Sequence, residues 1–219
     1  MPDSTGVVRV KICGLTRAED AAVAAAAGAA FLGVVFAGGP RRISAPAAAE
    51  VRAAAAGVPV FGVYGRHSVD DILRLTESAG LSGAQLHGDY AREDAARLRG
   101  AGLMVWRVVR IAAPEDLDAL ADAALDTDAV LVEPRVPHAA GGTGVSLNLA
   151  VAREARARLA GLTMALAGGL TPDTVAAAAS LVRPDVVDVS SGVERLPGIK
   201  DPDKIMRFLE AACGHSPIR

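Results

Sequence analysis

The stretch that decides the fold is Val-Val-Arg-Val-Lys-Ile-Cys, residues 7–13. This short run is rich in β-branched residues and bounded by Gly14, so it predicts a β-strand. Seven further apolar runs of similar length follow it, which makes eight candidate strands, at residues 7–13, 30–36, 59–64, 83–87, 104–111, 129–133, 162–167 and 186–190.

Segments of helical composition follow the candidate strands. They include residues 17–27, 69–79, 91–98, 114–125, 147–159, 172–181 and 204–212. Glycines stand where these and other helices should end, as left-handed caps do, at Gly28, Gly57, Gly80, Gly100 and Gly161. The alternation of strand and helix indicates an α/β protein with a parallel sheet.

Eight strand–helix units in 219 residues predict a single-domain TIM (β/α)8 barrel that spans residues 1–219. The alternative is a doubly wound open sheet. That fold places a G-x-G-x-x-G loop after its first strand in dinucleotide-binding proteins, and this chain has no such loop there. Its glycine-rich loops come late, after the sixth and seventh candidate strands, so we expect the barrel.

Alternation within the first and last strands orients their side chains. Val8, Val10 and Ile12 share one parity and should face the helices, whereas Lys11 and Cys13 should face the barrel interior. By the same reasoning Asp188 and Ser190 point inward from the last strand. The first and eighth strands of a barrel are neighbours, and unpaired buried charges are unfavourable, so we predict that Lys11 and Asp188 neutralise one another.

Composition narrows the classes of function. The formal net charge is −2 with acidic and basic residues interspersed, which argues against binding to nucleic acid or to an anionic membrane surface. The sequence has no signal peptide and no run of roughly 18 apolar residues, so we expect a soluble cytoplasmic protein. Cys13 and Cys213 form no metal-ligand spacing, so we expect no metal site. The sequence leaves open whether the chain is a monomer or a homodimer.

Two consecutive loops are suited to bind an anion. Active sites of TIM barrels lie at the C-terminal ends of the strands, and phosphates commonly bind after the last two. There Gly168 and Gly169 follow the seventh candidate strand, and Ser190, Ser191 and Gly192 follow the eighth. Their backbone N–H groups can approach a phosphate without obstruction, although glycines in ordinary turns would look the same in either loop alone. We therefore expect a small phosphorylated substrate.

Cys13 and Glu133 are the candidate catalytic residues. Cys13 ends the first strand and can act as a general base if nearby cations favour its thiolate; the alternative is a small buried hydrophobic residue. Glu133 ends the sixth strand among apolar neighbours, where desolvation would raise its pKa and suit a general acid; the alternative is a solvated loop carboxylate. An acid and a base on opposite walls of a barrel suit a proton-transfer isomerisation.

Five further residues are candidates for substrate binding. Arg41, in the loop after the second strand, can hold a carboxylate through its forked guanidinium. Gln85 and His87 end the fourth strand and can line the mouth, although His87 can equally be a hydrogen-bonded structural histidine. Lys11 and Asp188 point into the same interior.

Five motifs resemble those of the phosphoribosylanthranilate isomerases, and the match runs nearly from end to end. They are Lys-Ile-Cys-Gly-Leu-Thr at 11–16, Gln-Leu-His-Gly at 85–88, Gly-Gly-Thr-Gly at 141–144, Ala-Gly-Gly-Leu at 167–170 and Asp-Val-Ser-Ser-Gly-Val-Glu at 188–194. The resemblance implies a TIM barrel that catalyses, without a cofactor, the Amadori rearrangement of phosphoribosylanthranilate in tryptophan biosynthesis.

The resemblance also implies roles for single residues. Cys13 matches the family's general base, Arg41 the arginine that contacts the anthranilate group, and the loops at 168–169 and 190–192 the phosphate site. Glu133 stands where the family usually has aspartate, and the segment from there to Gly141 is one residue longer than expected. Alternatives are a dual-specificity or histidine-pathway phosphosugar isomerase, and a phosphate-binding barrel that has lost catalysis. The histidine-pathway enzyme uses two aspartates. Cys13 stands where the first of them would be, which argues against that alternative.

Overall fold

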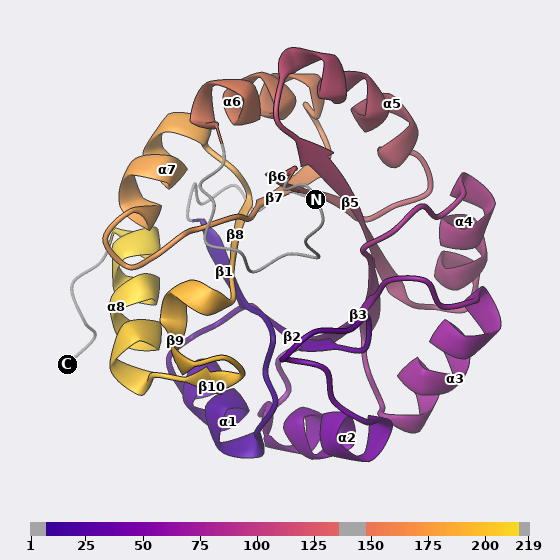
Figure 1. Cartoon of the computed structure of the whole chain (residues 1–219), viewed down its shortest axis with the longest axis vertical. Coiled ribbons are helices and arrows are strands. Elements are labelled where there is room, and N and C mark those ends of the chain that lie inside the picture. The colour runs from indigo at the N-terminus through magenta and orange to yellow at the C-terminus, as the bar shows by residue number, and fades with distance from the viewer. Residues whose placement is uncertain (1–7, 136–147, 215–219) are drawn as a thin grey trace.

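Eight parallel strands close into a barrel in the computed structural model, which describes residues 8–135 and 148–214 (Figure 1). β1 pairs with both β2 and β8, so the sheet has no free edge. The predicted TIM barrel is confirmed, and the open-sheet alternative is wrong. The strands are β1 Arg9–Ile12, β2 Phe31–Val35, β3 Val60–Tyr64, β4 Gly83–Leu86, β5 Met104–Ile111, β6 Ala129–Pro134, β7 Thr163–Leu166 and β8 Val186–Val189.

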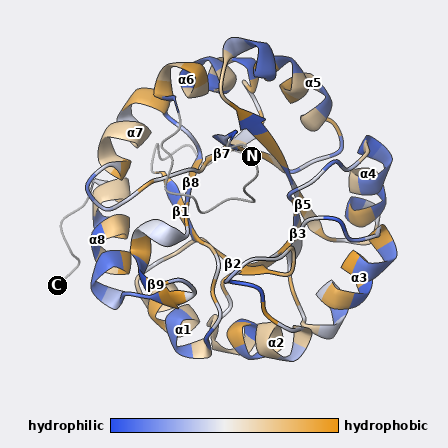
Figure 2. Ribbon diagram, in the orientation of Figure 1, coloured by the Kyte–Doolittle hydropathy of each residue, from blue (hydrophilic) through white to orange (hydrophobic). Residues whose placement is uncertain are grey.

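Helices form a ring around the barrel, and Figure 2 shows both hydrophobic and hydrophilic residues along most of them. Side-chain caps define several helix starts, because Ser44, Ser68, Asn148 and Asp201 each accept a hydrogen bond from an amide of the first turn. The α-helices are α1 Ala18–Ala26, α2 Ala45–Ala54, α3 Val69–Ser78, α4 Arg92–Gly100, α5 Ala119–Ala123, α6 Leu149–Arg158, α7 Val175–Val182 and α8 Pro202–Cys213.

Several local predictions were wrong. Residues 114–125 form a 3-10 turn, Pro114–Asp118, before the short α5, rather than one helix. α7 begins at Val175 because the Thr174 hydroxyl accepts from the Thr171 amide and closes a turn first. Gly100 is the last residue of α4 and no cap; the positive φ of 87° belongs to Gly102. A hairpin of β9 Glu194–Leu196 and β10 Ile199–Lys200, which turns at Gly198, was not predicted.

The hydrophobic core has two layers. The larger lies between the outer face of the strands and the helices, and a smaller cluster fills the barrel around Phe61, Trp106 and Leu131. The rings of Phe61 and Trp106 are 4.8 Å apart, and Phe31 packs edge-on against both. Such contacts contribute about 0.5–1.5 kcal/mol each beyond area burial. Apolar side chains therefore fill much of the barrel interior. Polar chemistry is confined to the C-terminal ends of the strands.

Lys11 and Asp188 meet inside the barrel as predicted. β1 and β8 place them directly opposite one another, with 2.9 Å between Lys11 Nζ and Asp188 Oδ1. Burial lowers the pKa of Lys11, but the attraction of Asp188 and Cys13 outweighs it and leaves the pKa above its usual value. The ammonium group is therefore charged and paired although its side chain is fully buried.

We expect Lys11→Met to lower the free energy of unfolding by about 3–5 kcal/mol, because it leaves the buried Asp188 carboxylate unpaired. Denaturant unfolding measures the change. Removing both charges in Lys11→Met/Asp188→Leu should cost less than the sum of the two single variants. Additive losses would mean that the two charges do not stabilise one another.

Candidate active site

Cys13 lies at the mouth of the barrel directly after β1. Its amide donates to the Val189 carbonyl at 2.8 Å, which keeps Cys13 in register beside β8. Gly33 of β2 leaves room for its side chain: a Cβ at Gly33 would lie 2.8 Å from Cys13 Sγ and 3.2 Å from Lys11 Nζ. The thiol therefore sits in an interior space that a larger residue at position 33 would fill.

The charge state of Cys13 depends on opposing effects. Burial raises the pKa of the thiol, whereas Lys11, through its charge and a hydrogen bond, and Lys200 act to lower it. The net pKa is raised, so the thiol is protonated in the free protein at neutral pH. The predicted nearby cations are present, but they do not outweigh burial together with the negative charge of Asp188, which also raises the pKa of Cys13.

Glu133 projects inward from β6 and meets His87. The distance from His87 Nε2 to Glu133 Oε1 is 2.7 Å, and Arg110 Nε donates to the same oxygen at 2.9 Å. Leu131 has the same parity as Glu133 and belongs to the cluster inside the barrel, so the Glu133 side chain also points into the barrel. Glu133 is 8% exposed, so it is not a solvated loop carboxylate.

The pKa of Glu133 differs from the prediction. Desolvation raises the pKa of this carboxyl group, as predicted, but the hydrogen bonds and charges of His87 and Arg110 outweigh it. The net pKa is lowered, so Glu133 is ionised in the free protein. The prediction of a raised pKa was wrong because it considered the apolar neighbours in sequence and missed the two donors in space.

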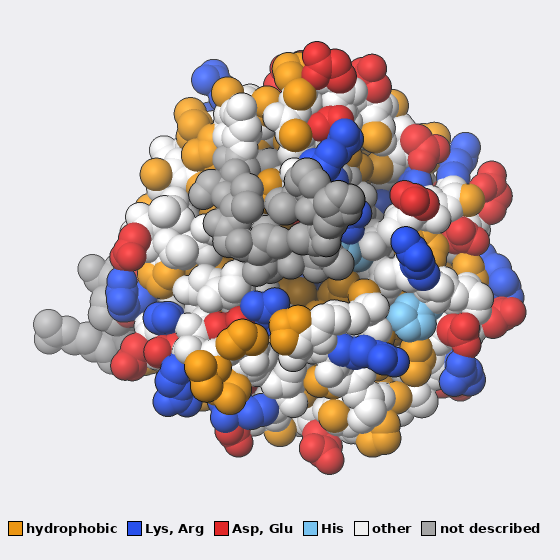
Figure 3. Space-filling model, in the orientation of Figure 1, with side chains coloured by type: hydrophobic (Ala, Val, Ile, Leu, Met, Phe, Trp, Pro, Cys, Tyr) orange, Lys and Arg blue, Asp and Glu red, His pale blue; other side chains and the backbone are white. Residues whose placement is uncertain are grey.

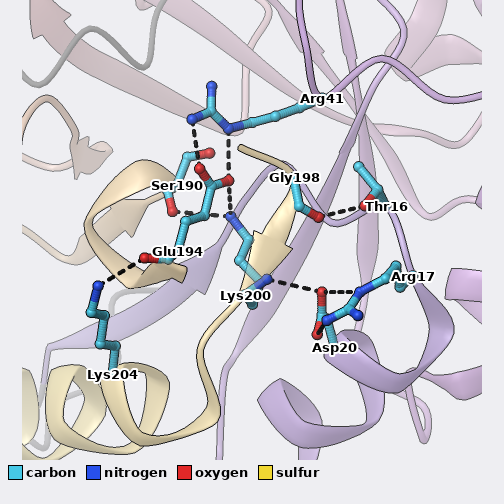
Figure 4. Close-up of polar contacts among 9 residues, drawn as sticks. All are labelled: Thr16, Arg17, Asp20, Arg41, Ser190, Glu194, Gly198, Lys200 and Lys204. Atoms are coloured by element: carbon cyan, nitrogen blue, oxygen red, sulfur yellow. Dashed lines mark hydrogen bonds and ion pairs between the residues drawn. The ribbon is translucent and has the colours of Figure 1, made fainter. Parts of the chain in front are cut away.

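Arg41 belongs to a charged network around the loop after β8 (Figure 4). Its guanidinium binds Glu194 in a bidentate pair, with Nε and Nη2 each 2.7 Å from a carboxylate oxygen. Lys200 Nζ donates to Glu194 Oε1 at 2.9 Å and to the Ser190 carbonyl at 3.0 Å. The network ties the loop after β2 to the loop that contains Ser190–Gly192, and it holds the Arg41 side chain in one orientation.

Asp20 fastens this network to the outer helices. The Lys200 amide donates to Asp20 Oδ2 at 3.1 Å, and Arg17 binds the same carboxylate through two nitrogens. Burial lowers the pKa of Lys200 and acts to raise that of Glu194, but Arg41 and Lys200 reverse the effect on Glu194 and lower its pKa. Glu194 is therefore an anion between two basic side chains (Figure 4).

The predicted phosphate loops lie side by side. A Cβ on Gly192 would clash with the backbone of Leu170, so the loops after β7 and β8 touch, and only glycine fits there. The amides of Gly168 and Gly169 make no backbone hydrogen bond among the described residues. Gly14 is close to this pair of loops, since a Cβ there would lie 2.6 Å from Ser190 Oγ. The Gly-Gly-Thr-Gly motif at 141–144 lies outside the described residues.

Gln85 lies in β4, two residues before His87, which follows the end of the strand. It is 3% exposed, and its Oε1 is buried with no hydrogen-bond partner in the described part of the chain. An unpaired buried acceptor is unfavourable, so this oxygen is open to a donor from a ligand or a water molecule.

The structure thus brings the predicted residues together in two groups. Cys13, Lys11 and Asp188 form the first, beside the Arg41 network and the glycine loops, and His87 with Glu133 forms the second. Arg110, Glu194 and Lys200 were not predicted as site residues from the sequence. Strand alternation could have found Arg110, because Trp106 and Arg110 share a parity on β5. No local pattern marks the other two as partners of Arg41.

Two further observations concern the described residues only. They contain no cluster of three or more His, Cys, Asp or Glu side chains that could hold a metal ion. None of their helices is long and apolar enough to cross a membrane.

On the face seen in Figure 3, basic and acidic side chains are interspersed, without a large patch of either sign.

Comparison with known proteins gives a consistent result. A family model, N-(5'phosphoribosyl)anthranilate (PRA) isomerase, matches residues 10–211. An N-(5'-phosphoribosyl)anthranilate isomerase of Pseudomonas fluorescens is 39% identical over 209 residues, which are 93% of this chain and 95% of the relative. The crystal structure of the isomerase from Thermotoga maritima is similar, with a TM-score of 0.86 and 32% identity, and the match covers 95% of this chain and 100% of that one.

Another similar crystal structure contains a ligand. It is a phosphoribosyl anthranilate isomerase in complex with reduced 1-(o-carboxyphenylamino)-1-deoxyribulose 5-phosphate. Its TM-score is 0.83 at 31% identity, and the match covers 95% of this chain and 100% of that chain.

Proposed function

This chain belongs to the N-(5'-phosphoribosyl)anthranilate isomerase family, and we propose that its barrel mouth carries out the family's reaction with Cys13 as general base and Glu133 as general acid. The reaction converts phosphoribosylanthranilate to 1-(2-carboxyphenylamino)-1-deoxyribulose 5-phosphate in tryptophan biosynthesis. The observation that carries the assignment is the family match over nearly the whole chain. A cysteine, Cys13, and a carboxylate, Glu133, also lie at the C-terminal ends of β1 and β6.

The rearrangement needs two proton transfers, one to the ring oxygen and one from C2, which are both bonded to C1. Protonated Glu133 gives its proton to the ribose ring oxygen, the bond from that oxygen to C1 breaks, and the nitrogen lone pair forms the Schiff base. The Cys13 thiolate then removes the proton from C2, which gives an enolamine that tautomerises to the ketone. An acid and a base on β6 and β1 can approach the ring from different sides.

Both residues must change protonation state before these steps. The free protein holds a carboxylate at Glu133 and a thiol at Cys13. The negative charge of a bound phosphorylated substrate raises the pKa of both groups, which favours the protonated form of Glu133. Lys11 and Lys200 favour the thiolate of Cys13, although in the free protein they do not outweigh burial. Catalysis therefore proceeds through the less populated form, with the proton on Glu133 and not on Cys13.

The remaining residues hold the substrate. Gly168, Gly169, Ser190, Ser191 and Gly192 present backbone amides and hydroxyl groups to the phosphate. Arg41 binds the anthranilate carboxylate, and because Glu194 occupies Nε and Nη2, this contact uses Nη1. Gln85 and the Lys11–Asp188 pair contact the polar groups of the sugar from below.

Gly169→Val tests the phosphate site. Product at about 100 times its Kd should stabilise the native protein by about 2.7 kcal/mol and raise Tm by several degrees. The valine side chain blocks the approach to the backbone, so most of this rise should disappear. Gly161→Val is the matched control, because Gly161 also has a positive φ but lies in the turn between α6 and the start of β7, at the opposite end of the strands from the mouth. An unchanged rise in Gly169→Val would remove Gly169 from the site.

The decisive test of function is growth of a tryptophan auxotroph that lacks this isomerase when it receives the gene. Purified protein should also convert phosphoribosylanthranilate to product. Comparable turnover of the histidine-pathway aminoaldose would identify a dual-specificity enzyme. Ligand binding without turnover would identify a barrel that has lost catalysis.

The reaction rearranges bonds and protons within one substrate, and the oxidation of C2 balances the reduction of C1, so we infer that the enzyme needs no cofactor and is classed with the aldose–ketose isomerases. We also infer a cytoplasmic location and either a monomer or a homodimer. Sedimentation distinguishes the two states, and activity after dialysis against a chelator tests independence of metal ions.

A further inference from the structure

Arg110 contacts two residues of the candidate site from the strand between them. β5 pairs with β4, which leads into His87, and with β6, which carries Glu133. The register of β5 and β6 places Arg110 directly opposite Glu133. The shared parity of Trp106 and Arg110 turns the Arg110 side chain toward the barrel interior.

The Arg110 side chain also contacts His87. Arg110 Nη2 is 3.0 Å from His87 Nδ1 and 3.4 Å from Nε2, so it lies beside both ring nitrogens. The ionised carboxylate of Glu133 can only accept, so His87 Nε2, at 2.7 Å from Glu133 Oε1, is the donor of that hydrogen bond. Arg110 therefore contacts both members of the His87–Glu133 pair.

Both donors use the same oxygen of Glu133. His87 Nε2 and Arg110 Nε both lie within 2.9 Å of Oε1, and no hydrogen bond from another described residue reaches Oε2. Hydrogen bonds to a charged carboxylate are short, directional and roughly twice as strong as neutral ones. One edge of the carboxylate is therefore fixed to the wall of the barrel, and the other is available to a ligand.

We propose that Arg110 is a positioning residue for the isomerisation: it anchors Glu133 through Oε1 and holds His87 as a donor to that oxygen, so that Oε2 faces the ribose ring oxygen. The proposal rests on the proposed role of Glu133 as the acid. Glutamate has one more rotatable bond than aspartate, so its carboxyl group needs this second anchor to stay in place. Arg110 acts on the reaction through Glu133 and not through the substrate.

The test is a double-mutant cycle on kcat and KM. Arg110→Met keeps an unbranched apolar stem and removes the donors, and the Arg110 side chain is 36% exposed, so the variant should fold. A displacement of about 1 Å at a reacting group can lower the rate on the order of a hundredfold, so we expect kcat to fall by about 10- to 100-fold with KM nearly unchanged. In the Glu133→Gln background the same change should have no further effect.

Two more variants sharpen the experiment. Arg110→Lys should recover part of kcat, because an ammonium group can donate to Oε1 but cannot also contact the His87 ring as the planar guanidinium does. Arg135→Met is the matched control: Arg135 lines the same cleft of about 700 Å³ as Arg110 and His87, but it pairs with Asp116. This control should keep normal kcat and KM.

The possible outcomes separate this proposal from the proposed function. Normal kcat in Arg110→Met beside an inactive Glu133→Gln overturns the role of Arg110 alone. Losses that multiply in the double variant, or a higher KM at normal kcat, also overturn it, because Arg110 would then act independently of Glu133. Normal turnover in Glu133→Gln overturns the acid assignment itself.

Discussion

Replacing Cys13 by alanine is expected to lower kcat by about a hundredfold to ten-thousandfold, the usual contribution of a general base. Cys13→Ser should lose nearly as much, although it preserves the shape of the side chain, because a hydroxyl group ionises far less readily than a thiol. The change removes little volume from a site that Gly33 already keeps open. Steady-state conversion of phosphoribosylanthranilate measures the effect.

Product binding and thermal unfolding show whether the Cys13 variants are intact. Both should stay close to those of the unchanged protein, so that the loss can be assigned to chemistry. Cys213→Ala is the matched control, since Cys213 is the last residue of α8 and contacts the Val8 carbonyl rather than the mouth. Near-normal kcat in Cys13→Ala would rule out Cys13 as the base.

The second large effect is expected at Glu133. Glu133→Gln keeps an oxygen for His87 and Arg110 to bind but has no acidic proton, so kcat should fall on the order of a hundredfold or more with a modest change in product affinity. Glu133→Asp withdraws the carboxyl group by about 1.5 Å, which separates it from both donors. We expect a loss on the order of a hundredfold there too.

Calorimetric titration with product and single-turnover kinetics distinguish binding from chemistry in these variants. Glu154→Gln, on the exposed surface of α6, controls for the loss of a carboxylate. If Glu133→Gln retains turnover, another group supplies the proton. If Glu133→Asp is fully active, the extra methylene group has no catalytic consequence.

The sequence by itself determined the barrel and half of the site. Strand periodicity is a local property, so it could identify eight strands and tell that Lys11, Cys13 and Asp188 face inward. The closed order of the strands then brought Lys11 and Asp188 to 2.9 Å from one another. Helix ends and the short α5 were predicted less well, because they depend on single turns such as that of Thr171 and Thr174.

Only the tertiary structure decided the electrostatics of the mouth. Arg110 and Glu133 are 23 residues apart in the chain, and Arg41 and Glu194 are 153 apart. No local pattern encodes these contacts, because the register and curvature of the closed sheet decide which side chains meet. Burial alone would raise the pKa of Glu133, but the hydrogen-bond donors that the barrel places beside it lower the pKa instead.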